Sequence, residues 1–400
     1  MSRCRLRIGI DVRLAHWPGI GRYIDEIVGR MVADQPGTDF VLFGNVAGPT
    51  TLQRYADPAL RERLHAPNVR FVDSPVTPFS PIEPLALGSA AREAGVHVMH
   101  SPYINIPWLS SGGPRLVTTL HDFRHPDLAL RLASPRSWAK RAYYETLTRL
   151  ALSRSRRLVC VSEFLAGQVR AFRPSVAARL VVIPHAAGDV FRPLPAAQAA
   201  ADVASWFGLQ GRYFLFVGTL KPHKNLIAAA SALAQPRVPA DVQLAVAAAP
   251  DRRYPDFQAA VAQLGLERRV RLLGHVEKER LPALYNAARA TVLPSSYESF
   301  GLPMVESMAC GTPVIAAPLA SLPEVGAAAA WYATPTPGAI AAVMDEALHD
   351  DASHACHREA GLRRAREFSW QRAAGAMHEI YRQVASEANG AAGNTSEVAP

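Results

Sequence analysis

Short runs of apolar, often β-branched residues recur along the chain and alternate with stretches of helical character. This alternation is typical of a doubly wound parallel sheet, in which helices connect successive strands. A turn-rich passage at 190–195 divides the runs into two series, so we expect two such sheets. The first series lies at 7–12, 40–44, 69–73, 96–102, 115–122, 157–162 and 179–185, and the second at 212–218, 242–248, 270–276, 290–295 and 312–318.

The predicted domain boundaries follow this division. With the turn-rich passage as a linker, residues 1–192 form the first domain and residues 193–366 the second. An amphipathic helix is predicted over 367–388, where apolar residues recur at helical spacing. The last residues, 389–400, are small and polar, and we expect them to be disordered. The apolar positions of the predicted helix include Trp370, Ala374, Met377 and Tyr381.

Composition agrees with two globular domains. The 400 residues exceed one ordinary core, and 49% of them are hydrophobic against 19% charged. No apolar stretch reaches the roughly 20 residues that cross a bilayer, and the start of the chain lacks the features of a signal peptide. These features predict a cytoplasmic protein.

The cysteine and histidine positions predict neither disulfides nor a metal site. The 4 cysteines are widely scattered, so we expect reduced, mostly buried thiols, with Cys310 as a small buried residue rather than a nucleophile. Histidines of the first domain are too dispersed to be recognised as zinc ligands; they include His97, His100, His121, His125 and His185.

The basic charge favours acidic partners. The formal net charge is +9, and the segment 134–158 concentrates basic and aromatic residues with Glu145 as its only acidic residue. Such a helix fits the surface of an anionic membrane, and it equally fits a solvated helix that covers the sheet. No nucleic-acid-binding module accompanies the charge, so nucleic acid is not expected as a partner.

The most informative motif places two carboxylates eight positions apart around a predicted helix start. Glu298 lies in the loop after a buried strand, and Glu306 lies in the first turn of a helix that begins at Pro303. Between them, Gly301 and Leu302 expose backbone N–H groups, which favour a phosphate. Carboxylates accept hydrogen bonds from the paired hydroxyls of sugars. The motif suits a sugar nucleotide; an acidic loop before a proline-started helix is the alternative.

A second motif follows the first strand of the second series. The strand ends near Val217, Gly218 lets the backbone approach a ligand, and Lys221 and Lys224 follow. Lysine is a compact cation with three donors, which suits a diphosphate. A solvated helix start with incidental charge is the alternative.

Two further candidates lie in the first domain. His121 and Asp122 end a strand, where an imidazole can reach a ligand or can be an ordinary structural residue. Gly19 and Gly21 follow the first strand as a dinucleotide fingerprint would, but Ile24 replaces the third glycine, which disfavours NAD. They form either a tight turn or a backbone surface for a phosphate or an acceptor.

These motifs, taken together, resemble retaining glycosyltransferase family 4, whose donor signature is similar to "PSSYESFGLPMVESMACGTPV". Ser299 stands where the family usually has Gly, and Thr219 stands where many members have a phosphate-binding Arg. The Thr form, with a basic Pro-x-Lys-Asn after it, resembles bacterial polysaccharide mannosyltransferases. Further matching segments follow in the family's order: "GIGRY" (19–23), "TTLHD" (118–122), "VSEF" (161–164), "VIPH" (182–185), "FVGTLKPHKN" (216–225), "LPALYNAA" (281–288) and "SLPEV" (321–325).

The resemblance implies the GT-B fold, in which two Rossmann-like domains face each other across a cleft and the last helix crosses back onto the first domain. It places Glu298 on the hydroxyls of the donor sugar, Glu306 on the ribose, and the first domain on the acceptor or phosphate side, with Gly19, Gly21 and Asp122. The implied catalytic residues are His121, Glu298 and Lys224. The implied donor-binding residues are Gly218, Thr219, Lys221, Lys224, Val276, Glu298, Phe300, Gly301, Leu302 and Glu306.

The implied activity is transfer of a hexose from a nucleoside-diphosphate sugar with retention of configuration, without a metal or other cofactor. The subgroup likeness favours GDP-mannose and a lipid-linked bacterial surface polysaccharide as acceptor, at the inner face of the cytoplasmic membrane. UDP- and dTDP-sugars stay open as donors, and a catalytically idle glycan- or nucleotide-binding protein on the same fold is the alternative from another class. A glycosidase, with both carboxylates flanking one glycosidic bond, is disfavoured.

Overall fold

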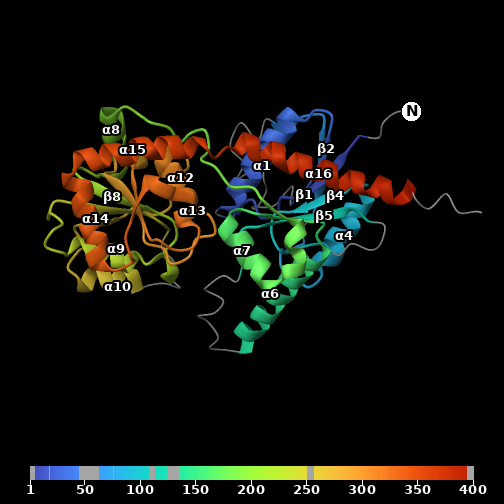
Figure 1. Cartoon of the computed structure of the whole chain (residues 1–400), viewed down its shortest axis with the longest axis horizontal. Coiled ribbons are helices and arrows are strands. Elements are labelled where there is room, and N and C mark those ends of the chain that lie inside the picture. Colours follow the sequence, from blue (N-terminus) through green and yellow to red (C-terminus); the bar gives the residue numbers. More distant parts are fainter. Residues whose placement is uncertain are drawn as a thin grey trace, which may run out of the picture. The chain divides into compact units, whose positions relative to one another are not determined.

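The computed structural model describes residues 5–17, 19–44, 63–74, 76–107, 113–123, 135–249 and 256–393. The chain divides into two compact units, and each contains one parallel sheet with helices around it (Figure 1). Unit 1 comprises Met1–His185 with Trp370–Pro400, and unit 2 comprises Ala186–Ser369. The prediction of two doubly wound α/β domains is confirmed.

Unit 1 contains a 7-stranded sheet in the order β3-β2-β1-β4-β5-β6-β7. All strand pairs are parallel, and the order reverses between β1 and β4. The strands are β1 (Arg7–Asp11), β2 (Asp39–Gly44), β3 (Val69–Asp73), β4 (Val98–Ser101), β5 (Arg115–Leu120), β6 (Arg157–Cys160) and β7 (Leu180–Val182). The helices are α1 (Ile20–Asp34), α4 (Glu83–Glu93), α6 (Pro135–Arg154), α7 (Glu163–Phe172), the 3-10 helix η1 (Pro174–Arg179) and α16 (Trp370–Gly393).

The last helix, α16, belongs to unit 1 although the whole of unit 2 precedes it in the sequence. It packs against α1, β4 and β5, and it buries Trp370, Met377 and Tyr381. The helix extends to Gly393, beyond the predicted end at 388 and into the segment expected to be disordered. Alanine has the highest helix propensity, so the Ala-rich sequence after 384 continues the helix. Residues 394–400 of the expected tail lie outside the described residues.

Unit 2 contains a 6-stranded parallel sheet in the order β10-β9-β8-β11-β12-β13, which reverses between β8 and β11. The strands are β8 (Tyr213–Val217), β9 (Gln243–Ala247), β10 (Val270–Leu272), β11 (Ala290–Leu293), β12 (Val314–Ala316) and β13 (Ala330–Tyr332). The α-helices are α8 (Ala196–Phe207), α9 (Leu226–Leu233), α10 (Asp256–Gln263), α11 (Leu281–Ala287), α12 (Leu302–Ala309), α13 (Leu322–Gly326), α14 (Pro337–His349) and α15 (Asp351–Arg366). Short 3-10 helices are η2 (Pro222–Lys224) and η3 (Ala327–Ala329).

Two details differ from the sequence-based expectation. Strand β13 is absent from the predicted series, because its residues, Ala-Trp-Tyr, include no β-branched residue and follow a row of alanines. The boundary between the units lies at 185/186, whereas the turn-rich passage suggests 192/193. Phe191 explains the difference, since its buried ring packs at 5.9 Å from that of Tyr285 in a core of unit 2.

Candidate functional site

The loops that leave β8 and β11 meet in unit 2, because these strands are neighbours where the strand order reverses. In doubly wound sheets this point, at the carboxyl ends of the strands, is where ligands bind. Ser296 donates from its backbone N–H and its hydroxyl to the carbonyl of His223, at 2.8 and 3.1 Å. The side-chain amide of Asn225 donates to the carbonyl of Pro294 at 2.9 Å. These bonds join the lysine-bearing loop to the carboxylate-bearing loop.

The joined loops bring Lys224 and Glu298 into direct contact. Lys224 Nζ lies 2.7 Å from Glu298 Oε1, and the two side chains are only 16% and 13% exposed. The same carboxylate oxygen accepts from the hydroxyl of Ser295 at 2.8 Å. On the backbone side, the hydroxyl of Ser321 donates to the carbonyl of Glu298 at 2.9 Å. The arrangement holds a cation and a carboxylate in fixed geometry at the ligand-binding edge of the sheet.

Glu306 occupies a deeper position on α12. It is 3% exposed, and its Oε2 accepts from the hydroxyl of Tyr285 at 3.0 Å. Tyr285 itself is fully buried on α11. The tyrosine therefore fixes the orientation of this carboxylate, whereas Glu298 is oriented by Lys224 and Ser295.

Gly301 caps α12 in a left-handed conformation, with φ of 94°. A Cβ at this position would also lie 3.0 Å from the side chain of Leu322, so a side chain here would be both strained and crowded. The turn directs the chain into α12 at Leu302, one residue before the predicted start at Pro303. The first turn of α12 therefore presents its backbone N–H groups at this end of the helix.

The remaining donor-side candidates lie in varied surroundings. Gly218 follows β8 directly, Thr219 is exposed, and Lys221 is partly buried just before η2. Val276 is buried in the core that also contains Tyr285. Phe300 is buried with its ring 5.6 Å from that of Phe368, edge to face, so its side chain packs within the unit and its backbone is the part adjoining Gly301.

In unit 1, His121 lies buried just after β5. Its ring is 4.8 Å from that of Tyr23 and 5.2 Å from that of His185. Burial lowers the pKa of His121 to about 3, so the imidazole is neutral at physiological pH. Its Nε2 is buried and has no hydrogen-bond partner among the residues that the structure describes. An orphaned nitrogen of this kind indicates an acceptor or donor that a ligand can engage.

The other acceptor-side candidates have clear structural explanations. A Cβ on Gly21 would lie 2.0 Å from the carbonyl oxygen of Ala15, so only glycine fits there. Gly19 adopts φ of 83°, which favours glycine, and Asp122 is partly buried after His121. The tight-turn interpretation of Gly21 is sufficient, and no described contact assigns it to a ligand.

Several supporting residues are absent from the sequence-based set of candidates. Tyr285 and Ser295 donate to the two carboxylates, Ser321 donates to the backbone carbonyl of Glu298, and Tyr285 lies within the matching segment "LPALYNAA". In unit 1, the ring of His100 shares hydrogen bonds with the hydroxyl of Thr119 at 2.9 Å and with the hydroxyl of Tyr381 at 2.7 Å. Sheet pairing brings Thr119 to His100 and the packing of α16 brings Tyr381 to it, and no local motif indicates either contact.

Three features of the described ranges bear on the expected partners. Within them, no group of three or more His, Cys, Asp or Glu side chains is arranged to hold a metal ion. No helix in those ranges combines the length and the apolarity needed to cross a bilayer. The basic segment 134–158 contains the whole of α6, on which Trp138 is 57% exposed; the side chains of Arg136 and Lys140 lie outside the described set.

Comparison with known proteins matches both units. Residues 17–187 match the model described as Glycosyltransferase Family 4, and residues 205–364 match Glycosyl transferases group 1. The chain is 27% identical to O-antigen chain mannosyltransferase B of Escherichia coli over 367 residues, which span 88% of this chain and 93% of that protein.

Solved structures share the fold. Sucrose-phosphate synthase from Thermosynechococcus elongatus is 21% identical with a TM-score of 0.74, covering 96% of this chain and all of that one. Anabaena HepE in complex with UDP and glucose is 18% identical with a TM-score of 0.71, covering 94% of this chain and 99% of that one.

Fold and site define an enzyme of the GT-B glycosyltransferase class. The chain belongs to glycosyltransferase family 4 and is similar to bacterial polysaccharide mannosyltransferases. The family resemblance recognised in its motifs is thereby confirmed, as is the expectation that it is a glycosyltransferase.

Proposed function

We propose that the enzyme transfers mannose from GDP-mannose, with retained configuration and without a metal ion, to a growing lipid-linked bacterial surface polysaccharide. The observation that carries the proposal is the Lys224–Glu298 pair at the point where the strand order of unit 2 reverses. The choice of mannose rests on the likeness to O-antigen chain mannosyltransferase B.

Each residue of the site has a chemical task in this proposal. Negative charge builds up on the departing diphosphate while the sugar becomes oxocarbenium-like, so Lys224 and the amides of Gly301 and Leu302 stabilise the transition state more than the ground state. Glu298 accepts from hydroxyls of the donor sugar, and Glu306 accepts from the ribose. Lys224 already contacts Glu298, so one pair links the phosphate end of the donor to its sugar end.

His121 is proposed to be a hydrogen-bond partner of the reacting sugar. A neutral imidazole with an unpartnered Nε2 can accept from, or donate to, a sugar hydroxyl without placing a positive charge beside the oxocarbenium-like centre. The acceptor hydroxyl then attacks from the face that the diphosphate leaves, and the departing phosphate takes its proton.

Nucleotide binding tests the donor site. Thermal stabilisation is measured with GDP, UDP, dTDP and their common sugar conjugates, in the unaltered protein and in Glu306→Ala. We expect one nucleotide to stabilise selectively and Glu306→Ala to weaken its binding about 10- to 100-fold, since a hydrogen bond to a charged group is worth about 1.5–3 kcal/mol. Stabilisation by UDP or dTDP alone would replace GDP-mannose, and unchanged affinity in Glu306→Ala would remove the ribose assignment.

Peripheral contact with the inner membrane surface is the second part of the proposal. An exposed Trp138 on a helix with basic residues is suited to the interface of an anionic bilayer. Changing Arg136, Lys140 and Arg141 together to Gln should weaken binding to vesicles that contain phosphatidylglycerol, because each basic residue near the surface contributes about 1 kcal/mol. Unimpaired vesicle binding would remove α6 as the contact.

A further inference from the structure

The strand order of unit 1 reverses between β1 and β4, so the carboxyl ends of these strands mark a second ligand-binding edge. The loop after β1 contains Trp17, and the loop after β4 contains Tyr103. Neither residue belongs to the donor site of unit 2. A transferase needs a place for its acceptor as well as for its donor. The family resemblance gives the backbone of Gly19 and Gly21 at this edge a role on the acceptor or phosphate side, and it assigns no side chain of the edge to a ligand.

Three aromatic side chains gather there and form what we call the aromatic platform: Trp17, Phe79 and Tyr103. The rings of Trp17 and Phe79 are stacked, with centroids 5.7 Å apart and planes inclined by 21°. Tyr103 meets both edge-on, at 6.2 and 5.8 Å. Trp17 is 37% exposed. Part of the platform is therefore open to a ligand.

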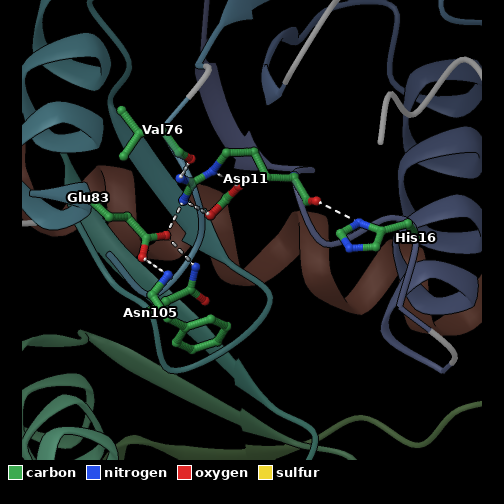
Figure 2. Close-up of polar contacts among 7 residues, drawn as sticks. Asp11, His16, Val76, Glu83 and Asn105 are labelled. Atoms are coloured by element: carbon green, nitrogen blue, oxygen red, sulfur yellow. Dashed lines mark hydrogen bonds and ion pairs between the residues drawn. The ribbon is translucent and has the colours of Figure 1, made fainter. Parts of the chain in front are cut away.

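A buried charge network holds in place the loop between β3 and α4, which contains Phe79 (Figure 2). Arg13 Nη2 donates to Asp11 at 2.7 Å and to Glu83 at 2.5 Å, and Nη1 donates to the carbonyl of Val76 at 3.1 Å. The other carboxylate oxygen of Glu83 accepts the backbone N–H of Phe79. Phe79 has φ of 66°, a conformation that few residues other than glycine adopt. Such strain, held by buried bonds, is typical of functional positions.

The charge of this network disfavours a phosphate. Two carboxylates, Asp11 and Glu83, face one guanidinium, and Arg13 already donates from Nε, Nη1 and Nη2 to protein acceptors. The network has no excess positive charge to offer. A nucleotide or a phospholipid headgroup is therefore a poor partner for this edge, whereas an uncharged ligand is not penalised.

Polar groups without partners lie within two positions of the platform residues in the sequence. Ser80 Oγ, Ser101 Oγ and Asn105 Oδ1 are buried and have no hydrogen-bond partner within the described part of the chain. Ser80 follows Phe79, and Ser101 and Asn105 flank Tyr103; Asn105 donates to Glu83 at 2.7 Å. An unpaired buried polar group costs about 1–3 kcal/mol. Three of them on the segments that contain the aromatic rings indicate a ligand that combines an apolar face with hydroxyl groups.

We propose that the aromatic platform binds one sugar ring of the glycan acceptor. The C–H face of the ring stacks on Trp17, and ring hydroxyls pair with the polar groups around it; the charge network positions the loop and does not touch the sugar. Sugar rings are uncharged and have one apolar face and a hydroxyl rim, which matches all three observations. The inference rests on the proposed function, since only a transferase acting on glycans would present such an acceptor.

Binding of sugars observed by saturation-transfer NMR tests the platform. The probes are mannotriose and the methyl glycosides of mannose, glucose, galactose and rhamnose, offered to the unaltered protein and to Trp17→Ala, Trp17→Leu and Trp17→Phe. The matched control is Trp206→Ala, which removes a 41% exposed tryptophan of α8 in unit 2. We expect at least one probe to bind through its ring protons, with about tenfold weaker binding in Trp17→Ala and Trp17→Leu. Trp17→Phe should retain most of the affinity, and Trp206→Ala should retain all of it.

Nucleotide binding, measured on the same variants, separates this inference from the proposed function. It should be unchanged in every Trp17 variant. Circular dichroism verifies separately that the variants are folded, and Trp17→Leu preserves bulk should Trp17→Ala fail this check. A protein that binds its nucleotide but none of the sugars, or binds the sugars equally well without an aromatic ring at 17, overturns the platform and leaves the donor site standing. Loss of nucleotide binding in folded Trp17→Leu would assign the platform to a base and likewise overturn the inference. If the assignment of the donor site is wrong, the nucleotide affinity of Glu306→Ala will equal that of the unaltered protein.

Discussion

At the scale of single residues, the two carboxylates of the donor motif differ in what orients them. Glu298 shares its charge with Lys224 at a partly exposed position, whereas Glu306 is nearly fully buried and accepts from the neutral hydroxyl of Tyr285. A carboxylate has about four lone-pair sites, so the bond from Tyr285 occupies only part of its capacity as an acceptor. Ribose hydroxyls would satisfy that capacity, which makes the orientation of Glu306 by Tyr285 a testable part of nucleotide binding.

Changing Tyr285→Phe should weaken nucleotide binding by about 5- to 10-fold, because it removes one hydrogen bond, worth about 1 kcal/mol, that helps to orient Glu306. Tyr213→Phe is the matched control, since the Tyr213 hydroxyl donates to the carbonyl of Leu284 at 2.8 Å in the same core. Both variants should lose a similar free energy of unfolding, measured with urea. Equal nucleotide affinity in the two variants would show that Tyr285 is only structural.

Lys224→Ala should slow transfer about 100-fold, the usual effect of removing one donor from a developing negative charge. It also leaves the Glu298 carboxylate without its cation in a partly buried position. Transfer rates are measured in the steady state at saturating donor, so that weaker donor binding, caused by the unpaired Glu298, does not lower them. Lys221→Ala is the control from the same loop. A rate that falls equally in both variants would contradict the special position of Lys224.

At the scale of elements, α16 shows how unit 1 depends on the end of the chain. It packs on α1 and reaches β4 and β5, and Tyr381 contacts His100 within the sheet. Arg157, the first residue of β6, forms an ion pair with Glu387 at 2.6 Å, so the helix contacts the sheet from Trp370 near its start to Glu387 near its end. The loops after β8 and β11 show the same logic in unit 2, where neighbouring strands place Lys224 beside Glu298.

Met377→Ala should destabilise the protein by about 2–5 kcal/mol, because it leaves a cavity where a fully buried side chain was. Glu379→Ala, on the exposed face of the same helix, should change stability by less than about 1 kcal/mol even though it breaks an ion pair with Arg382. Urea unfolding followed by circular dichroism measures both. A small effect of Met377→Ala would mean that α16 packs loosely on unit 1.

At the scale of the whole molecule, titration of buried histidines links the stability of unit 1 to pH. Burial lowers the pKa of His100 and of His121 to about 3, and it lowers the pKa of His185 as well. All three lie in unit 1, and Trp370 of α16 packs its ring 5.2 Å from that of His185. The neutral form is therefore part of the folded state of this unit.

The free energy of unfolding should be greatest above pH 6.5 and should fall as the pH drops below it. The histidines of the unfolded chain then bind protons, whereas the buried histidines of the folded chain stay neutral. Each histidine contributes on the order of 1 kcal/mol per pH unit, so the loss between pH 7.5 and 5.5 should be a few kcal/mol. Urea unfolding at the two values measures it. His121→Gln should reduce this dependence, and an unchanged dependence in that variant would show that other groups dominate.

The sequence by itself determined the two sheets and singled out the candidate residues of the donor site. Apolar β-branched runs predicted 12 of the strands that the structure contains, because a strand that is buried on both faces is apolar along its own length. Glu298, Glu306 and Lys224 could be named as candidates because helix starts and the loops that follow strands are short-range features. The order of the strands and the hand of their connections are strongly constrained in such folds, so the α/β fold class could be predicted from the series of strands.

Only the tertiary structure decided which side chains meet. Lys224 and Glu298 are 74 positions apart, and Arg13 and Glu83 are 70 apart; strand order and loop direction bring them together. The same holds for Tyr285 with Glu306 and for the aromatic platform, whose members lie on three separate loops. Local sequence patterns do not identify such partners, because a contact between distant residues depends on the packing of every element between them.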